Sequence, residues 1–191
     1  MSQRKNVKEA LAKSFRELLL VHPFEKITIK MITDNIGVIR PTFYNHFIDK
    51  YEVLEWICYK DIFEDLGILV DQNLFSEAIE ILFHKIEENK AFYLRAVKVQ
   101  GQNAFNDIFC KQITTLIETA FESLGNSLHT KNKVFTPRLM STYYAQGITY
   151  IVEQWLINDL AISASDMTKA YYVLATTSME KMIEKGYQED E

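Results

Sequence analysis

Apolar residues recur every three or four positions along most of the chain, the spacing of amphipathic α-helices, and no strand-like alternation persists. The first helix is expected to end near His22-Pro23, and a short second helix to span residues 29–36 with Thr28 as its N-cap. Further helices are expected over residues 51–62, 75–86, 105–124, 137–158 and 166–185, the last with Ser165 as N-cap, and a loop over 125–136. The predicted fold class is all-α.

The stretch from Ile36 to Phe47 has the pattern of a helix-turn-helix unit. Gly37 suits the left-handed backbone position that ends one helix, and Pro41 suits the first turn of the next helix, where its missing N–H leaves no hydrogen bond unmade. Phe43 and Phe47 are four residues apart, so both can pack inward from one helix face. The polar residues between them would then face outward, within reach of phosphates and base edges of DNA. A plain helical hairpin with an aromatic core is the alternative interpretation.

A longer set of residues around this unit resembles the signature of the TetR family of bacterial transcriptional regulators. The matching segments are Thr28-Ile29-Lys30-Met31-Ile32, Gly37-Val38, Thr42-Phe43-Tyr44-Asn45-His46-Phe47, Asp49-Lys50 and Val53-Leu54. Farther along, Phe92-Tyr93-Leu94 and Gly101-Gln102-Asn103-Ala104-Phe105 resemble the C-terminal domain of a Gram-positive subgroup that includes activators of dihydroxyacetone kinase operons. The resemblance implies a three-helix DNA-binding domain over residues 1–50 and a larger helical dimerisation and effector domain over residues 51–191.

The resemblance also implies roles for individual residues. Thr28 and Lys50 would contact phosphates, each at the start of a helix. Arg40, Thr42 and Asn45 would read base edges, where Arg favours guanine and Asn favours adenine in bidentate geometry. Tyr44 and His46 would contact the DNA backbone through their polar tips. For each of these residues, a solvated surface position is the alternative.

Two residues beside the predicted reading helix depart from the family pattern. Ile39 stands where many members have Ser or Thr, and it cannot cap the helix with a side-chain oxygen. Pro41 stands where Gly is frequent and removes a flexible point of close backbone approach to DNA. Both departures bear on base preference and leave the docking mode unchanged.

The charge of the chain is unevenly distributed. The 191 residues carry a formal net charge of −5, which by itself is unfavourable for a nucleic-acid binder. Residues 1–50, however, contain nine Lys or Arg against five Asp or Glu, a net +4, and residues 51–191 carry −9. A basic N-terminal segment on an acidic body provides the local attraction for phosphate that binding to double-stranded DNA requires.

The cysteine content and the hydropathy of the chain bear on metal binding and on membrane association. Cys58 and Cys110 lie in apolar helical patterns and are expected to be buried free thiols. Because the sequence has neither a C-x-x-C pair nor a Cys/His cluster, we expect no metal and no cofactor. The N-terminus is charged, and no apolar stretch approaches the ~18 residues of a membrane-spanning helix, so a cytoplasmic protein without a membrane segment is expected.

The helix expected over residues 137–158 is apolar on more than one stripe, so it needs more than one partner. In the family that the chain resembles, the last two helices pair with their copies in a second subunit. A two-fold homodimer also presents two reading helices to a palindromic operator. The residues expected in this interface are Leu139, Tyr143, Gly147, Tyr150, Ile151 and Trp155. A monomer is the alternative.

Aromatic residues of the C-terminal part are candidates for the lining of a small-molecule effector pocket, and they are equally what an aromatic-rich core would contain. They are Phe92, Tyr93, Phe105, Phe109, Tyr143 and Tyr144.

The leading functional hypothesis is a homodimeric TetR-type regulator, a repressor or an activator, controlled by a small-molecule effector or a protein co-regulator. The alternative is a helical protein-interaction module whose acidic C-terminal domain docks a partner protein and holds no small-molecule pocket. An enzyme is not expected, because the chain has six Gly, no phosphate-cradling G-x-x-x-x-G-K loop and no legible Ser/His/Asp or Cys/His arrangement.

Overall fold

The computed structural model describes residues 2–101, 104–123 and 134–185. Over these ranges the chain forms helices and no β-strand, which confirms the predicted all-α class. The N-terminal elements are α1 (Ser2–Val21), the 3-10 turn η1 (Phe24–Lys26), α2 (Ile29–Asp34) and α3 (Arg40–Tyr44). They are followed by α4 (Lys50–Cys58), the π-helical turn η2 (Tyr59–Phe63), α5 (Glu64–Asp71), α6 (Phe75–Glu88), α7 (Lys90–Ala96), α8 (Phe105–Ser123), α9 (Pro137–Ile157), α10 (Ala164–Thr176) and α11 (Met179–Lys185).

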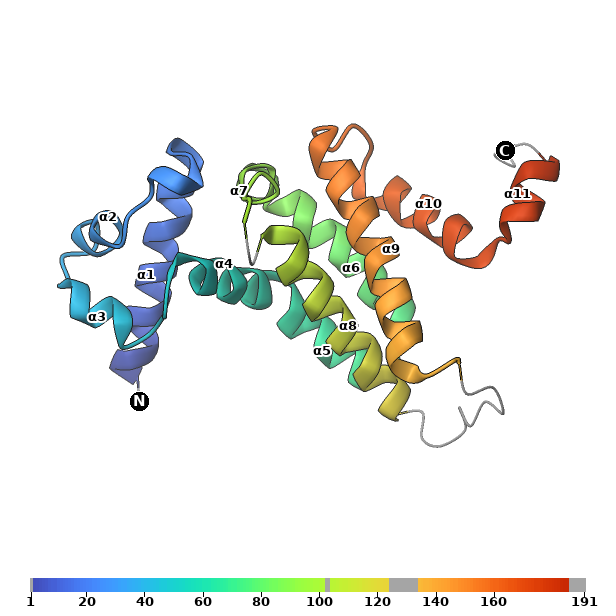
Figure 1. Ribbon diagram of the computed structural model, residues 1–191, viewed down its shortest axis with the longest axis horizontal. Helices are drawn as coiled ribbons and strands as arrows, with labels where there is room; N and C mark the ends of the chain where they lie inside the picture. The colour runs from blue at the N-terminus through green and yellow to red at the C-terminus, as the bar shows by residue number, and fades with distance from the viewer. Residues whose placement is uncertain (1, 102–103, 124–133, 186–191) are drawn as a thin grey trace.

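Helices α1 to α3, with η1, form a small head at one end of an elongated molecule, and α4 leads from this head into a larger helical body (Figure 1). The head closes around apolar side chains that are at most 4% exposed: Phe15, Phe24, Ile32 and Phe43. Helix α1 packs against α2 and α4, and also against α7 of the body. Helix α1 is therefore part of the head and also contacts the body.

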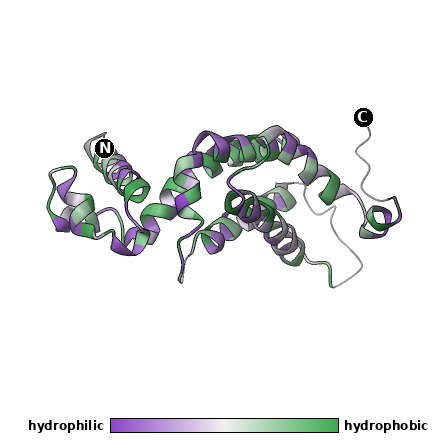
Figure 2. Cartoon of the chain, turned by 90° about the horizontal axis from the view of Figure 1, so that it is seen from above, coloured by the Kyte–Doolittle hydropathy of each residue, from purple (hydrophilic) through white to green (hydrophobic). Residues whose placement is uncertain are grey.

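In the body, α8 and α9 form the most extensive helix pair, α10 packs on α6, and α5 packs on both α6 and α8. Figure 2 shows hydrophobic and hydrophilic residues interleaved along each helix, as expected when each helix buries one side. Helix α11 lies beyond α10, at the end of the molecule opposite the head (Figure 1).

The structure corrects two predicted helix boundaries. The second helix ends at Asp34 rather than at Ile36, because the chain turns there toward a glycine with positive φ. Helix α10 begins at Ala164, and its cap is Ser163, whose Oγ accepts a hydrogen bond from the Asp166 amide at 3.1 Å. The predicted cap, Ser165, lies inside the first turn of the helix.

Further differences concern the number of helices, and one of them is α5, which lies beyond the helix expected over residues 51–62. The helix expected over residues 166–185 is two helices, α10 and α11, separated at Thr177, whose backbone is extended. Helix α7 is absent from the sequence prediction, because at seven residues it is short and Asn89 does not cap it with its side chain. Most of the predicted loop, residues 125–133, lies outside the described residues.

Cys58 is buried and Cys110 half-buried, and both are free thiols. Within the described ranges, none of the helices combines the length and the apolarity that crossing a membrane requires. In the same part of the chain, no group of three or more His, Cys, Asp or Glu side chains is placed to hold a metal ion.

Candidate nucleic-acid interface

The turn between α2 and α3 is built from residues with local backbone roles. Thr28 caps α2 as predicted, since its Oγ1 accepts a hydrogen bond from the Met31 amide at 3.2 Å. Gly37 has φ +69°, and its amide donates to the Asp34 carbonyl at 3.2 Å to close the turn. Pro41 lies in the first turn of α3, also as predicted. These local features of Thr28, Gly37 and Pro41 shape the turn between α2 and α3.

Helix α1 holds α2 through hydrogen bonds that involve polar side chains. The Ser14 Oγ, in a side chain that is 1% exposed, donates to the Ile32 carbonyl at 2.9 Å. The Asn35 amide nitrogen donates to the Ser14 Oγ and to Glu17 Oε2, both at 3.2 Å. Because a buried hydroxyl needs partners to offset its desolvation, this network fixes the position of α2 on α1.

Helix α3 has an inner and an outer face. Phe43 and Phe47 are 0% and 2% exposed, and their ring centroids lie 5.8 Å apart. The residues predicted to contact DNA occupy the outer side of α3 and the start of α2: Arg40, Pro41, Tyr44, Asn45 and Thr28 are exposed, and Thr42 and His46 are half-buried. The structure therefore leaves the predicted reading side chains accessible over a buried aromatic base.

Lys50 has a structural role that the sequence does not reveal. Its Nζ donates to the carbonyls of Phe24 and Ile27 at 2.7 and 3.1 Å and lies 4.3 Å from the centroid of the Phe24 ring. Burial lowers the pKa of the Lys50 ammonium, while the Glu25 and Asp49 carboxylates oppose this shift. Two of its three donors are used within the chain, and they tie the start of α4 to the segment that precedes α2.

A polar cluster joins the head to the body beside η2. Arg16 Nη2 pairs with Asp61 Oδ2 at 2.5 Å, and the Arg16 guanidinium lies 4.4 Å from the centroid of the Phe92 ring. The Tyr93 hydroxyl donates to the same Asp61 oxygen at 3.2 Å, and Arg16 Nη1 donates to Asn89 Oδ1 at 3.3 Å. The cluster connects α1 of the head with η2 and with the start of α7.

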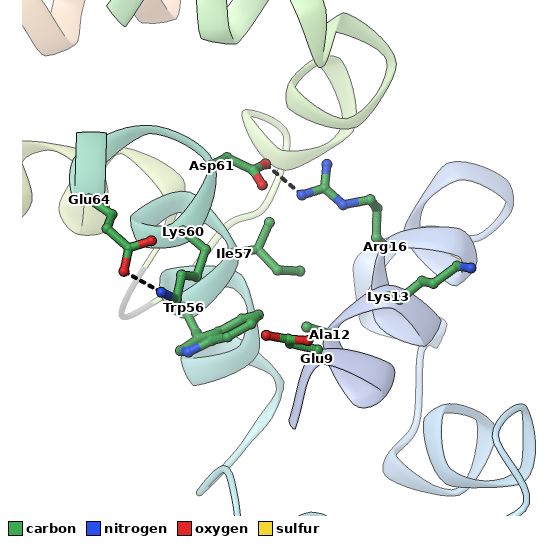
Figure 3. A pocket seen from close by; sticks show the side chains of 9 residues that line it. All are labelled: Glu9, Ala12, Lys13, Arg16, Trp56, Ile57, Lys60, Asp61 and Glu64. Carbon is green, nitrogen blue, oxygen red and sulfur yellow. Dashed lines mark hydrogen bonds and ion pairs between the residues drawn. The ribbon is translucent and has the colours of Figure 1, made fainter. Parts of the chain in front are cut away.

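An open groove of about 440 Å³ lies beside this cluster, between α1 and the continuous path of α4, η2 and α5. Figure 3 shows the Arg16–Asp61 and Lys60–Glu64 pairs among the side chains that line it. Sequence reasoning missed Arg16 and Asp61, because they are 45 residues apart and no local pattern marks either of them. Paired changes of charge at the two positions among homologues would be the signal that reveals such a contact.

The six residues predicted to line an effector pocket fall into two groups in the described part of the structure. Four of them are buried and pack against one another, edge-on or tilted, in the body: Phe92, Tyr93, Phe105 and Phe109. Neighbouring ring centroids in this aromatic cluster lie 5.2, 6.0 and 5.3 Å apart. The other two, Tyr143 and Tyr144, are exposed on α9, at 72% and 43%.

An apolar face lies open on α9 and α10. Leu139 and Tyr150 are 48% and 62% exposed, and with Tyr143 they follow one side of α9. A hollow of about 420 Å³ lies where α9 and α10 meet, and its lining includes Gly147, Ile151 and Leu174. We call this surface the α9–α10 face. Among the described residues, nothing lies within 4 Å of the position that a Cβ on Gly147 would occupy, so a second backbone has room to approach.

Trp155, which the sequence places among the interface residues, lies in the core of the subunit and outside the α9–α10 face. It is 3% exposed, its ring centroid lies 5.6 Å from that of Phe83, and its indole N–H donates to the Ile162 carbonyl at 3.0 Å. The physical reason is that α9 is apolar on both sides. Periodicity alone therefore does not separate its inner side from its outer side.

Comparisons with known proteins agree with this architecture. A family model described as the transcriptional regulator C-terminal region, TetR_C_8, matches residues 73–177. The HTH-type dhaKLM operon transcriptional activator DhaS of Lactococcus lactis subsp. lactis (strain IL1403) is 26% identical over 108 residues, which are 56% of this chain and 57% of that protein. A solved structure of the dihydroxyacetone kinase operon activator DhaS has 20% sequence identity and a TM-score of 0.59, and the alignment covers 88% of this chain and 94% of the other. At that identity the structural likeness shows the fold.

Proposed function

Because the chain belongs to the TetR family of transcriptional regulators, we propose that it binds a palindromic DNA operator as a homodimer. The observation that carries the proposal is the outer side of α3, where polar side chains stand exposed over the buried Phe43 and Phe47. This arrangement is that of a recognition helix, which enters the major groove and is positioned by the elements behind it. The net charge of +4 on residues 1–50 supplies the attraction for phosphates.

The proposed dimer forms through the α9–α10 face. Exposed aromatic and aliphatic side chains on two adjacent helices are unfavourable in water and are typical of subunit interfaces. A two-fold axis through this face would pair each copy with the same residues of the other, as an isologous contact requires. Both heads would then be available to one duplex, at half-sites separated by one helical turn or a multiple of it.

Control of DNA binding is proposed to act through the junction between head and body. The Arg16–Asp61 pair and the Tyr93 hydrogen bond connect α1 with the body. A conformational change in the body would therefore be transmitted to the head through these contacts. An effector or co-regulator would alter operator affinity only by its differential affinity for two head arrangements. The proposal assigns the chain a regulatory and not an enzymatic role, in the cytoplasm.

A second candidate is a co-regulator that docks a partner protein on its acidic body. The packed aromatic cluster favours this alternative, because Phe92, Tyr93 and Phe105 occupy with their own rings the space in which an effector was expected. In that case the net −9 of residues 51–191 would provide the docking surface for a basic partner. Selection of DNA by the purified protein separates the two candidates.

The test is selection of bound sequences from a random duplex pool, followed by measurement of affinity for the winner as a function of salt. We expect an enriched palindrome whose binding weakens with salt, and loss of selectivity at one base position in Arg40→Ala. Arg95→Ala is the matched control, because Arg95 is an exposed arginine on α7 of the body. A folded protein that enriches no sequence even at low salt would contradict the proposal and favour the docking role.

A further inference from the structure

Arg40 and Tyr44 contact each other across one turn of α3. Arg40 Nη2 donates to the Tyr44 hydroxyl oxygen at 3.0 Å, and the guanidinium carbon lies 5.6 Å from the centroid of the Tyr44 ring. Residues four apart on a helix are neighbours, so the pair forms without distortion of the backbone. Both side chains are exposed, and Tyr44 is 49% accessible.

The Tyr44 ring is itself held from below. It meets the ring of Phe43 edge-on, with centroids 5.5 Å apart and planes at 86°. Phe43 is completely buried and packs on Phe47 at 5.8 Å. A continuous series of contacts therefore runs from the core of the head, through Phe43 and Tyr44, to the Arg40 guanidinium.

The start of α3 offers few other polar groups to a base pair. Ile39 has no polar side-chain atom, and Pro41 has no N–H. The Thr42 amide is already used, since it donates to the Ile39 carbonyl at 2.9 Å. Of Ile39, Arg40 and Pro41, only Arg40 has a side chain that can hydrogen-bond to a base, and the Thr42 hydroxyl lies one position farther along.

We propose that Tyr44 is a positioning residue that holds the Arg40 guanidinium for bidentate contact with a guanine in each half-site, and that it thereby sets base selectivity. The guanidinium has five N–H donors, and one bond to Tyr44 leaves enough for the O6 and N7 acceptors of guanine. A restrained arginine also loses less rotamer freedom when it binds. This inference rests on the proposed DNA-binding function, and it differs from the simple phosphate contact that the family resemblance implies for Tyr44.

The experiment is a double-mutant cycle on the selected operator. Affinities of wild type, Tyr44→Phe, Arg40→Ala and the double variant are measured at one salt concentration, for the selected duplex and for a duplex in which the guanine is replaced by adenine in both half-sites. We expect wild type to discriminate by roughly 5- to 150-fold per half-site. We expect Tyr44→Phe to reduce that ratio by roughly two- to tenfold, because it removes one hydrogen bond to a charged group. In the Arg40→Ala background, Tyr44→Phe should leave the ratio unchanged.

Two controls separate positioning from general damage. Tyr59→Phe removes a hydroxyl from an exposed tyrosine in η2, and it should leave both affinities at the wild-type level. Arg40→Lys keeps the charge and lacks the planar fork, so it should retain affinity and lose selectivity. Thermal unfolding of each variant checks that the head remains folded.

Other outcomes would overturn the inference. Equal weakening of both duplexes by Tyr44→Phe, with or without Arg40, would show that Tyr44 contacts a phosphate instead. An unchanged discrimination ratio in Tyr44→Phe, or an operator with no guanine whose replacement is sensed through Arg40, would also contradict it. Failure to enrich any operator would be recognisably different, because it would overturn the proposed function and this inference together.

Discussion

At the scale of single residues, Lys50 illustrates how one ammonium can connect two segments of the head. Its two carbonyl partners are on Phe24, the first residue of η1, and on Ile27, the residue that follows η1. Thr28, the cap of α2, follows directly. The position of α2 therefore depends in part on a side chain that belongs to α4.

Substitution of Lys50 by methionine should lower the free energy of unfolding by about 1–3 kcal/mol, because two carbonyls lose a charged donor. Urea unfolding monitored by circular dichroism measures the change. The exposed Lys26 in η1 provides the control, and Lys26→Met should change stability by less than about 0.5 kcal/mol. If Lys50 acted only as a phosphate contact, stability would be unchanged and the salt slope of DNA binding would fall by about 1.

The buried thiol of Cys58 and the buried hydroxyl of Tyr93 predict that the stability of the protein falls at alkaline pH. Burial raises the pKa of the Cys58 thiol and of the Tyr93 hydroxyl, and the nearby Asp61 carboxylate adds to both shifts. The unfolded chain loses these protons near its ordinary pKa values, about 8.5 and about 10, whereas the folded chain keeps them. The folded state therefore binds more protons above about pH 8.5, and its stability falls as the pH rises.

Wild type should lose up to about 1.4 kcal/mol of stability per pH unit for each of these two groups, once the pH exceeds the ordinary pKa of that group. Urea unfolding between pH 7 and 10.5 measures the slope. Tyr93→Phe should show a shallower decline above pH 10, since it has no proton to lose at that position. Identical slopes for wild type and Tyr93→Phe would contradict this account.

Residue roles that follow from local rules could be predicted from the sequence. Gly37, Pro41 and Thr28 each satisfy a requirement of the backbone within four residues, and the structure confirms all three. Lys50 and Trp155 could not be assigned in this way. For Lys50 the partners lie 26 and 23 residues away, and for Trp155 the side of the helix depends on Phe83, in another helix.

At the scale of elements, α3 is a five-residue helix without a side-chain cap. So short a helix is unstable by itself in water and is held by the packing of Phe43 and Phe47. Ile39, at the N-cap position, has an extended backbone that a serine could adopt, and its side chain is 70% exposed. Little apolar burial would be lost if it were replaced.

Ile39→Ser should therefore raise the free energy of unfolding by at most about 0.5 kcal/mol, because the new hydroxyl could only share the Thr42 N–H, which already donates to the Ile39 carbonyl at 2.9 Å. Thr28→Ala is the opposite test, and it should lower stability by about 1 kcal/mol by removing an existing cap. Both changes are measured by urea unfolding. A destabilised Ile39→Ser variant would show that the isoleucine side chain contributes packing that its exposure does not reveal.

The spacing of apolar residues predicted the long helices correctly. It did not predict a break between two helices where the apolar spacing continues across the break. Met179 and Ile183 continue a helical pattern beyond Thr177, although the backbone there is extended. Ser163 and Ser165 are both acceptable caps by composition, and only the hydrogen bond to the Asp166 amide distinguishes them. The π-helical turn η2 has no marker in its sequence.

At the scale of the whole molecule, the α9–α10 face should decide the oligomeric state. Tyr143→Asp combined with Tyr150→Asp should give a monomer, because burying two unpaired carboxylates in an interface costs several kcal/mol. Both positions are exposed in the single chain, so the subunit itself should remain folded. Sedimentation velocity measures the mass.

Ile68→Asp is the matched control for this substitution, because Ile68 is an apolar residue on α5 that is 55% exposed and lies outside the α9–α10 face. It should leave the mass unchanged. The double tyrosine variant should also bind its operator more weakly, since one head reads only one half-site. A dimer that survives both tyrosine changes would place the interface elsewhere.

The contact between α4 and α8 has a consequence for how the chain is made. Helix α4 ends at residue 58 and α8 at residue 123. At the ordinary speed of translation, synthesis of α8 is completed about 3 to 13 seconds after that of α4. The side of α4 that packs on α8 stays without this partner during that interval. A nascent chain therefore exposes the side of α4 that α8 later covers, and chaperones can bind it until α8 has been made.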